Sequence, residues 1–395
     1  MIYRIGNIEL DLDRMELRLG GEQQPVEPQV FRLLLHLIEN RDRLVTKDDL
    51  INAVWGGRII SDATLSSRIS SARRAMGDSG TRQHSIRTIA RNGYRFVAEV
   101  EVSENQTATP LERNGRSQDR LIRYCVAPDG VQLAYSITGK GPALVKTMSW
   151  LNHLEFDWES PVFSDLFQKL TQEHTLLRYD SRGAGLSDKH PDDFSFEALA
   201  SDLETAIDAS GLEKFALLGI SQGAALAIDY AARYPQRVSH LLLWGGYARG
   251  RKRRGNKQDE EKAQAFRTLM RYGWGKDSST FRQMFSALYL PEANEEQIRW
   301  WTELQRIATT PENAIRLRDT IDDIDVSDRL ALVKAPTLIL HSEREEVAPI
   351  SEARQMAAKI PDATVVPLDS ANHLVLPQET AWHRAVAAIG DFLQN

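Results

Sequence analysis

Residues 215–230 read FALLGISQGAALAIDY and decide how the larger part of this chain folds. The apolar start of the stretch predicts a short buried strand, and the alanine-rich end predicts a helix. Between them, Gly219 and Gly223 have no side chains, so the strand and the helix can pack closely around a sharp turn. Ser221 lies at the apex of that turn. We expect its backbone to be strained and its hydroxyl to be presented outward.

The stretch has the pattern G-x-S-x-G between a strand and a helix, and in this it resembles the nucleophile elbow of the α/β-hydrolase family. A second stretch supports the resemblance. Residues 180–187 read DSRGAGLS, similar to the D-x-R-G-x-G-x-S turn that is common after the family's fourth strand. The glycines and ion pairs of such a turn usually serve the turn itself, so we interpret this second stretch as structural.

Strands and helices alternate from residue 121 onward, which predicts a mainly parallel sheet with helices on both faces. The resemblance to the family covers this whole region, residues 121–395. We expect strands near 121–126, 131–137, 143–148, 175–179, 215–219, 238–243, 336–341 and 363–367. We expect helices in most of the gaps, notably at 196–210, 222–233, 351–359 and 380–393.

A serine hydroxyl is a poor nucleophile until an imidazole takes its proton, and the imidazole needs a carboxylate to fix its tautomer. The resemblance implies the chain order Ser, acid, His. His373, in DSANHLVL, follows the last predicted strand and lies where the family has its base. The acid position, where the family normally has Asp, is occupied by Glu345 in HSEREEVAPI. Glu343 and Glu346 are close enough in the sequence to remain alternatives.

Hydrolysis of an acyl group also needs two backbone N–H groups that stabilise the oxyanion. One would come from Gln222, which follows the nucleophile. The other would come from the loop after the third strand, where many relatives have His-Gly. This chain has no His-Gly there, so Ser149 or Trp150 would have to supply the amide. A protein that keeps the serine and the histidine only to bind a ligand would show the same sequence.

An insertion at about 246–330 interrupts the alternation at the family's cap position and has helical patterning. Its aromatic residues could wall an apolar ligand pocket over Ser221, or they could form the core of the cap. The residues that we expect in the pocket are Trp150, Trp274, Phe285, Tyr289 and Trp300. The basic run RKRR at 251–254 could bind an anion or DNA, although a solvated surface loop is the simpler interpretation.

The first hundred residues have a different organisation. Residues 2–19 predict short strands. We expect helices from about residue 28, after Thr46 and from residue 61 or 62 to residue 76, and then a hairpin at 86–89 and 94–97. The stretches VFRLLLHLIENRDRLVTKDDLINAVWG, SDATLSSRISSARRAMG and IRTIARNGYRF resemble the OmpR-type winged helix-turn-helix domain over nearly all of residues 1–100. The resemblance implies that this part of the chain binds double-stranded DNA.

The third helix of such a domain is the one that enters the major groove. Its apolar positions fall on one side and should be core: Leu65, Ile69, Ala72 and Met76. The other sides carry hydroxyls and guanidinium groups that can contact bases and phosphates, on Ser67, Arg68, Ser70, Ser71, Arg73 and Arg74. On the hairpin, we expect backbone phosphate or minor-groove contacts from Arg87, Arg91 and Arg95. The alternative is an arginine-rich face that is merely solvated.

The charge distribution favours the DNA-binding interpretation. The chain of 395 residues has a formal net charge of −6, but residues 58–98 hold eight arginines against Asp62 and Asp78. The composition is that of a soluble globular protein, and no apolar run approaches the roughly 18 residues of a membrane span. We therefore expect a cytoplasmic protein. The single Cys125 excludes an internal disulfide and a Cys-based zinc site, and we expect neither a metal nor a cofactor.

We predict a winged-helix DNA-binding domain at 1–102, a polar linker at 103–120 and an α/β-hydrolase domain with a helical cap at 121–395. This arrangement predicts a one-component transcriptional regulator. A small apolar or aromatic ligand would bind under the cap and shift the DNA-reading domains, and we expect the protein to be a homodimer. The alternative is a serine hydrolase of esters, lactones or amides with an accessory DNA-binding domain. The two functions can coexist if slow hydrolysis resets the signal.

Overall fold

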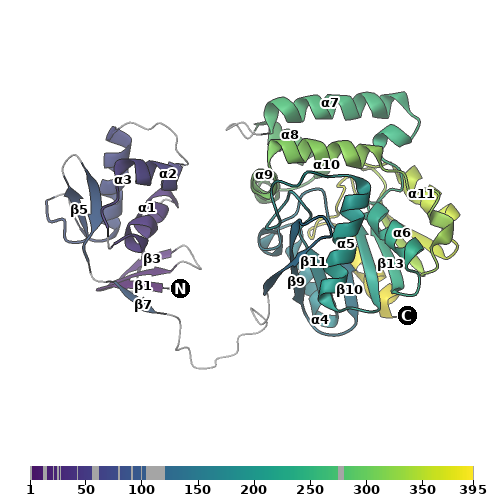
Figure 1. The fold of residues 1–395 in the computed structure, drawn as a ribbon, viewed down its shortest axis with the longest axis horizontal. Helices are drawn as coiled ribbons and strands as arrows, with labels where there is room; N and C mark the ends of the chain where they lie inside the picture. The colour runs from purple at the N-terminus through teal and green to yellow at the C-terminus, as the bar shows by residue number, and fades with distance from the viewer. Residues whose placement is uncertain are drawn as a thin grey trace. The chain divides into compact units, whose positions relative to one another are not determined.

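The computed structural model divides the chain into two compact units, unit 1 with residues 1–116 and unit 2 with residues 117–395 (Figure 1). Each unit has its own hydrophobic core. Among the residues that the structure describes, no helix is long and apolar enough to cross a membrane. The described residues are 2–11, 16–20, 22–24, 26, 28–41, 43–55, 62–78, 81–89, 92–98, 100–103, 121–274 and 280–394.

Unit 1 contains a five-stranded antiparallel sheet in the order β4-β3-β2-β1-β7. Three strands lie in the predicted range 2–19: β1 (Ile2–Ile5), β2 (Ile8–Asp11) and β3 (Glu16–Leu19). A further strand beyond that range, β4 (Glu22–Gln24), was not predicted. The fifth, β7 (Glu101–Ser103), pairs with β1 and was not predicted. Three residues are too few for an alternating pattern to be recognised, and Ser103 had been assigned to the linker.

Three helices and a hairpin complete the described part of unit 1. The helices are α1 (Pro28–Glu39), α2 (Lys47–Trp55) and α3 (Asp62–Ala75), and the hairpin strands are β5 (Ile86–Ile89) and β6 (Gly93–Phe96). Thr46 caps α2 in a reciprocal arrangement with Asp49. The Asp49 amide donates to Thr46 Oγ1 at 3.1 Å, and the Thr46 amide donates to Asp49 Oδ2 at 3.0 Å. These elements confirm the predicted winged helix-turn-helix fold.

The hairpin of unit 1 is fixed to the rest of the unit by a close backbone contact. Gly93 has φ +144°, and a Cβ there would lie 2.2 Å from the carbonyl oxygen of Val45. Only glycine fits such an approach. The next residue, Tyr94, exchanges two backbone hydrogen bonds with Val45, at 2.8 and 2.9 Å. The hairpin is thereby held against the segment that precedes α2.

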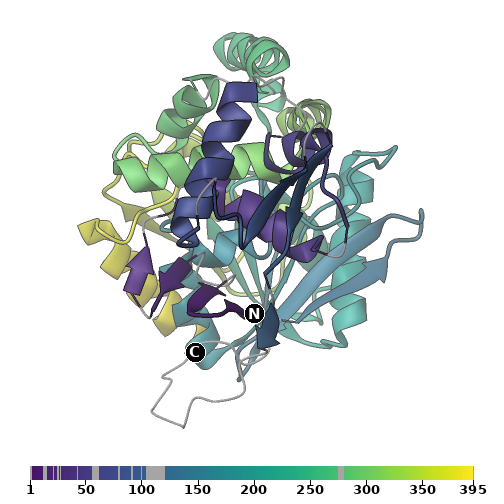
Figure 2. The ribbon, with the colours of Figure 1, turned by 90° about the vertical axis from the view of Figure 1, so that its left-hand side faces the viewer.

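Unit 2 is built on an eight-stranded sheet in the order β15-β14-β13-β12-β10-β11-β9-β8. Six strands are parallel, and the antiparallel β8 and β9 form one edge (Figure 2). All eight predicted strands are confirmed to within two residues. Their bounds are β8 (Ile122–Val126), β9 (Gln132–Thr138), β10 (Ala143–Lys146), β11 (Thr175–Tyr179), β12 (Phe215–Ile220), β13 (Val238–Trp244), β14 (Thr337–Ser342) and β15 (Ala363–Leu368).

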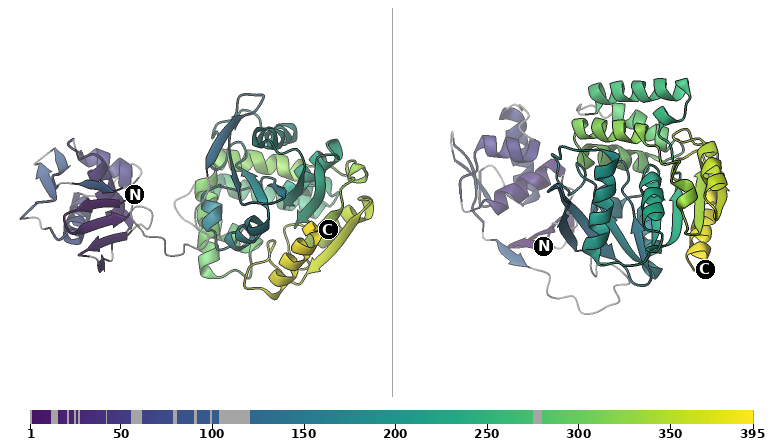
Figure 3. Two further views of the ribbon diagram at one scale, coloured as in Figure 1. Left: turned by 90° about the horizontal axis from the view of Figure 1, so that it is seen from below. Right: turned by 45° about the vertical axis from the view of Figure 1, so that its right-hand side comes forward.

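Helices cover both faces of this sheet (Figure 3). One face is covered by α5 (Phe196–Ser210), α6 (Gly223–Arg233) and α11 (Ile350–Lys359), and the other by α4 (Ser164–Glu173) and α12 (Thr380–Gln394). Between β13 and β14 the chain forms the predicted helical cap (Figure 1). The cap contains the 3-10 turn η2 (Arg251–Arg253) and the helices α7 (Lys257–Gly273), α8 (Thr280–Tyr289), α9 (Glu295–Ala308) and α10 (Pro311–Asp323).

The turn at residues 180–187 is held by a buried ionic network. Arg182, only 1% exposed, donates to the two carboxylate oxygens of Asp202 at 2.9 and 2.7 Å. It also pairs with Asp129 at 2.6 Å. Gly185 lies so close to Asp180 that a Cβ would be 2.0 Å from Oδ2 of that carboxylate. The charged groups of this turn, Asp180 and Arg182, are bonded within the fold, which agrees with the structural interpretation of the sequence.

Candidate active site and nucleic-acid interface

Ser221 lies between β12 and α6 in a left-handed backbone conformation, with φ +56°. For a residue with a Cβ this conformation costs on the order of 1 to 2 kcal/mol. Two glycines make the sharp turn possible. A Cβ on Gly219 would be 2.6 Å from the Cα of Ala224, and a Cβ on Gly223 would be 2.3 Å from the carbonyl oxygen of Met148. The predicted strand, turn and helix are therefore present at this stretch.

The structure brings the three predicted triad residues together. Ser221 Oγ is 2.8 Å from His373 Nε2, and His373 Nδ1 is hydrogen-bonded to Glu345 Oε2. Glu345 lies in the turn after β14, and His373 follows β15. All three are less than a tenth exposed, whereas the alternative acids Glu343 and Glu346 are exposed. Since a carboxylate accepts only, Nδ1 carries the proton that bonds Glu345, and Nε2 is free to accept the serine proton.

A second histidine, His341 at the end of β14, lies on the other side of the same carboxylate. Its Nε2 is 2.9 Å from Glu345 Oε1 and 3.0 Å from the carbonyl oxygen of Ala348. The hydrogen-bond geometry is good only toward Ala348, and Oε1 has no hydrogen-bond donor among the described residues. The contact with Glu345 is therefore mainly electrostatic. The sequence signal was a histidine four residues before the acid, and our sequence analysis missed it.

The pKa values of Glu345 and His341 are both shifted, in opposite directions. Burial alone would raise the pKa of Glu345, but the charge of His373 and the contact with His341 outweigh burial and hold this pKa below its ordinary value. Burial alone would lower the pKa of His341, but the neighbouring Glu345 carboxylate outweighs it and raises this pKa. Glu345 therefore stays ionised at neutral pH, as an acid that orients an imidazole must.

These shifts predict a pH-dependent stability. A base whose pKa is raised by folding stabilises the protein fully below its unfolded pKa, about 6.5, and the stabilisation is lost as pH rises through the folded pKa. His341→Gln should therefore lower the free energy of unfolding of unit 2 by about 1 kcal/mol near pH 6 and by less at higher pH. Urea unfolding followed by tryptophan fluorescence measures this, because Trp55 alone among the tryptophans lies in unit 1.

A matched control for His341 is His240 on β13. Burial and then the charge of Lys214 lower the pKa of His240. The contribution of His240 to stability should therefore change with pH in the direction opposite to that of His341. The difference between wild type and His240→Gln should become more favourable to wild type as pH rises. A His341→Gln difference that is constant with pH, or that follows the same trend as His240→Gln, would contradict the electrostatic role of His341.

The two segments that were predicted to supply the oxyanion amides are in contact. Gln222 lies at the start of α6, and Thr147 Oγ1 donates to the carbonyl oxygen of Gly223 at 3.0 Å. The loop that begins at Thr147 continues directly into Ser149 and Trp150. Among the described residues, the backbone amides of Gln222, Ser149 and Trp150 have no protein acceptor. These amides are therefore available to an oxygen that develops negative charge beside Ser221.

Four of the five predicted pocket residues form one aromatic group beside the triad. The Trp150 ring centroid is 5.4 Å from that of Trp274, 5.6 Å from that of Phe285 and 5.9 Å from that of Tyr289. The Tyr289 ring is 5.6 Å from the His373 ring, and its carbonyl oxygen accepts from the His373 amide at 2.8 Å. Cap residues from α7 to α8 are thus in contact with the loop after β10 and with the histidine.

The fifth predicted pocket residue, Trp300, does not join this group. Its ring stacks on Phe156 at 5.0 Å and meets Phe163 and Trp301 edge-on, at 6.0 and 6.2 Å. These contacts tie α9 of the cap to the segment before α4. The prediction that Trp300 belongs to the wall beside Ser221 is corrected accordingly. The helical patterning of the cap did not distinguish the two adjacent tryptophans, of which Trp301 is the one within 6.1 Å of Tyr289.

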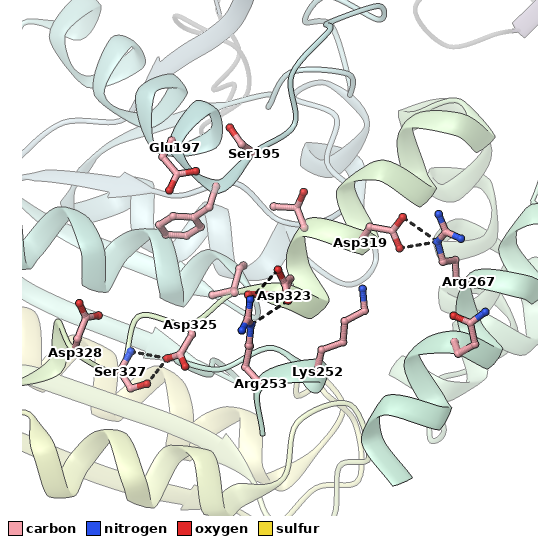
Figure 4. A pocket seen from close by; sticks show the side chains of 14 residues that line it. Ser195, Glu197, Lys252, Arg253, Arg267, Asp319, Asp323, Asp325, Ser327 and Asp328 are labelled. Atoms are coloured by element: carbon pink, nitrogen blue, oxygen red, sulfur yellow. Dashed lines mark hydrogen bonds and ion pairs between the residues drawn. The ribbon is translucent and has the colours of Figure 1, made fainter. Parts of the chain in front are cut away.

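An open groove of about 1080 Å³ lies elsewhere on unit 2, between the start of α5 and the cap elements η2, α7 and α10 (Figure 4). No triad residue lines it. Two of its basic side chains have acidic partners, because Arg253 pairs with Asp323 at 3.0 Å and Arg267 pairs with Asp319 at 2.8 Å. Five acidic side chains line the groove against three basic ones, and none of the predicted pocket residues does, so the predicted ligand site is not this groove.

On α3 of unit 1, the predicted buried side is confirmed. The four predicted core residues, the last of which directly follows the helix, are at most 2% exposed: Leu65, Ile69, Ala72 and Met76. Of the predicted DNA-contacting side chains, Ser67, Ser70 and Arg74 are exposed, and Arg68 and Ser71 are half-buried. The Ser70 hydroxyl donates to its own helix, at the carbonyl oxygen of Ser66.

Arg73 must be removed from the predicted DNA-contacting set. It is 6% exposed, and its guanidinium donates to the carbonyl oxygen of Ile86 at 3.0 and 2.8 Å and to Thr88 Oγ1 at 2.8 Å. The side chain connects α3 to β5. The N–H groups that make these hydrogen bonds point at the hairpin and are not available to a nucleic acid. Helical periodicity predicted that Arg73 lies next to the exposed side of α3. The residue is buried because the hairpin packs over it.

On the hairpin, Arg87 and Arg95 are directly opposite each other in the β5–β6 ladder, and both are exposed. Like charges in such a pair are destabilising when nothing compensates them. A surface that keeps two facing guanidinium groups is suited to an anion such as a phosphate backbone. The third predicted hairpin arginine, Arg91, lies outside the described residues.

Two family profiles match the chain. The profile described as "alpha/beta hydrolase fold" matches residues 149–380. The profile described as "Transcriptional regulatory protein, C terminal" matches residues 21–96. The first match covers more than half of the chain and contains Ser221, Glu345 and His373, and the second contains α1, α2, α3 and the hairpin.

Individual relatives agree with these matches. The chain is 25% identical to a pyrrolizixenacetamide deacetylase of Xenorhabdus hominickii over 258 residues. The aligned region covers 63% of this chain and 91% of that protein. The chain is 29% identical over 218 residues to an N-formylmaleamate deformylase of Pseudomonas putida, spanning 55% of this chain and 77% of that protein.

Among solved structures, a hydrolase from Pseudomonas aeruginosa superposes with a TM-score of 0.58 at 22% identity, covering 72% of this chain and all of that one. At that identity the likeness shows the fold alone. The strand order, the profile over residues 149–380 and this superposition lead to one assignment. The chain belongs to the α/β-hydrolase fold family, and its N-terminal unit is an OmpR-type DNA-binding domain of transcriptional regulatory proteins.

Proposed function

We propose that this protein is a one-component transcriptional regulator whose hydrolase domain senses, and slowly hydrolyses, a small ester, lactone or amide. The observation that carries the proposal is the presence, in one chain, of a DNA-binding domain and of a serine, histidine and glutamate in hydrogen-bonding series. The proposed domains are residues 1–102 and 121–395, with residues 103–120 as the linker.

The proposed hydrolysis uses the geometry beside Ser221. Ser221 Oγ attacks the acyl carbonyl carbon while His373 Nε2 takes its proton, and Glu345 stabilises the imidazolium that forms. The amides of Gln222 and of Ser149 or Trp150 donate to the oxyanion of the tetrahedral intermediate. His373 then protonates the leaving alkoxide or amine. Water, activated by the same histidine, releases the acid from the acyl-enzyme. The two relatives described above, a deacetylase and a deformylase by name, support chemistry at an acyl group.

The proposed regulation requires that a ligand bind one arrangement of the DNA-reading domains better than another, because equal affinity shifts no equilibrium. A ligand held between Ser221 and the aromatic group touches the C-terminal end of α7 through its capping residue Trp274, and α8 through Phe285 and Tyr289. The cap is therefore the element through which occupancy could act. A homodimer is the proposed working form, since one small DNA-reading domain rarely supplies enough specificity alone.

For DNA recognition, we propose that the exposed side of α3 enters the major groove and that the hairpin arginines meet the backbone. Ser67 and Arg74 are exposed on α3, and Arg87 and Arg95 are exposed on the hairpin. Each phosphate that these cations neutralise should contribute about −0.9 to the slope of log affinity against log salt concentration. Binding should therefore weaken steeply between dilute and physiological salt.

Arg74→Ala should weaken binding to a specific operator by roughly 1 to 3 kcal/mol if its guanidinium reads a base edge. The operator can be obtained by selection from a random duplex pool, and fluorescence anisotropy then measures the affinity. The matched control is Arg4→Ala, which removes the same charge from unit 1 but from a surface pair with Glu9. Equal effects of the two substitutions would remove Arg74 from the reading surface.

The second candidate function is a serine hydrolase for which the DNA-binding domain is an accessory. The assembled triad is the observation that favours it. Turnover separates the two candidates. Steady-state hydrolysis of activated esters at rates on the order of 10 per second would favour the enzyme, because that is typical of working enzymes. Turnover orders of magnitude slower, together with DNA affinity that responds to the ester, supports the regulator.

A further inference from the structure

Arg251 is a charged residue of the cap that is buried without an acidic partner among the described residues. It begins η2 and is only 4% exposed, unlike its exposed neighbours Lys252 and, at 51%, Arg253. Its guanidinium carbon lies 4.6 Å from the centre of the Phe266 ring. Among the residues that the structure describes, no carboxylate lies within ion-pair distance of Arg251, and no acceptor is hydrogen-bonded to it.

Such an arrangement is costly without an anion. An arginine stays charged at neutral pH, and taking its charge out of water is repaid only by a close counter-charge or by hydrogen bonds. Burial, followed by the charge of Arg318, lowers the pKa of Arg251 to about 10, which still leaves it charged. Asp322 is the nearby buried acid, but both of its oxygens already accept from Arg318. Arg251, Arg318 and Asp322 together therefore carry two positive charges and one negative charge, and the charge of Arg251 is left uncompensated.

This charge lies against the aromatic group. Phe266, over whose ring the Arg251 guanidinium is placed, has its ring centroid 5.0 Å from that of Phe285, and the Phe285 ring is 5.6 Å from that of Trp150. Arg318, whose charge acts on Arg251, has its guanidinium carbon 5.6 Å from the Trp150 ring and donates to Tyr289 Oη at 3.3 Å. The Tyr289 ring in turn is 5.6 Å from the His373 ring. The rings of Phe266, Phe285 and Tyr289 thus connect the Arg251 guanidinium to His373, with the Phe285 and Tyr289 ring centroids 6.4 Å apart.

The neutral polar groups around the aromatic group are also donors without acceptors. The indole Nε1 of Trp150, the indole Nε1 of Trp274 and the amide Nε2 of Gln222 are buried and have no hydrogen-bond partner among the described residues. An indole or amide N–H can only donate. These three donors and the guanidinium of Arg251 would be completed by a ligand rich in acceptors.

We propose that the ligand of the hydrolase unit is a small molecule with an apolar or aromatic body and a carboxylate, and that Arg251 binds the carboxylate. This inference rests on the proposed function in one respect, that the ligand occupies the region between Ser221 and the cap. It adds the charge of the ligand and the residue that recognises it. The aromatic rings of Trp150, Phe285 and Tyr289 contact the body, and the guanidinium selects acids over neutral analogues.

The test compares two esters of the same size, mono-4-nitrophenyl glutarate, which carries a carboxylate, and 4-nitrophenyl pentanoate, which is neutral. Wild-type protein should show the higher kcat/KM with the glutarate. Arg251→Met, which keeps an unbranched apolar stem and removes the guanidinium, should lower kcat/KM for the glutarate by on the order of 10- to 100-fold and for the pentanoate by less than about 3-fold. The matched control, Arg253→Met in the same turn, should change neither.

Loss of the same size on both esters, or no loss on either, would overturn the proposal. Circular dichroism melting of Arg251→Met confirms that any loss is not unfolding. If wild-type protein cleaves neither ester, hydrolysis fails but the binding inference is still tested, by calorimetry of Ser221→Ala with 4-phenylbutyrate and with its amide. Binding of the acid alone, lost in Ser221→Ala/Arg251→Met, supports the proposal. Equal binding of acid and amide, or no binding of either, overturns it.

Discussion

Ser221→Ala should lower kcat/KM for activated esters by a factor of about 10⁶, because the triad residues act as a unit and the remaining oxyanion donors supply only a small part of catalysis. In the variant, the bond between Ser221 Oγ and the acyl carbon cannot form. In the wild type, the Ser221 hydroxyl gives its proton to His373 Nε2, which is 2.8 Å from Oγ. Steady-state release of 4-nitrophenolate measures the change.

The control for Ser221→Ala is Ser342→Ala, which removes another fully buried hydroxyl, at the end of β14, that has no hydrogen-bond partner among the described residues. This control should retain the wild-type rate. Affinity for DNA without ligand should be unchanged in both variants, since unit 1 is not altered. Retention of more than about a tenth of the activity in Ser221→Ala would show that the ester is cleaved at another group.

Arg182→Leu should lower the free energy of unfolding of unit 2 by about 3 to 5 kcal/mol, the largest stability effect that we expect. The substitution leaves Asp202, which is fully buried, without the guanidinium that donates to both of its oxygens. It also frees the turn at residues 180–187 that connects β11 to the rest of the unit. Urea unfolding followed by tryptophan fluorescence measures the loss.

The double variant Arg182→Leu/Asp202→Leu should recover part of this stability, because an apolar pair of similar volume removes the unpaired buried charge. An exposed pair gives the control. Lys257→Ala removes one partner of the surface contact between Lys257 and Glu261, whose side chains are 89% and 68% exposed, and should change stability little. A loss below about 1 kcal/mol in Arg182→Leu would mean that Asp202 is satisfied by water or by another group.

Local sequence patterns were enough to predict most of the fold. The strand and helix around Ser221 were predicted because apolar runs and close-packed glycines act over a few residues, and the structure has them at 215–220 and 223–233. His373 and Glu345 were found because the family fixes their places after two particular strands. The core side of α3 followed from helical periodicity alone.

Long-range packing decided what the sequence could not show. Arg73 was predicted to face DNA, but the hairpin covers it and takes its donors through Ile86 and Thr88. Trp300 and Trp301 are adjacent in sequence, yet only the latter approaches Tyr289. Arg251 was interpreted as part of a solvated basic run, and the cap buries it against Phe266. In each case the element that covers the side chain is distant in the sequence.

The central claim, that occupancy of the hydrolase site controls DNA binding, is tested most directly by blocking Ser221 with an aryl fluorophosphonate. Fluorescence anisotropy of a selected duplex then measures affinity before and after the block, with Ser221→Ala as the unreactive control. We predict binding that weakens with salt and an affinity that changes at least about 5-fold on blocking, the lower limit of typical coupling between sites. No binding of any duplex in dilute salt, or an unchanged affinity after complete labelling, would contradict the claim.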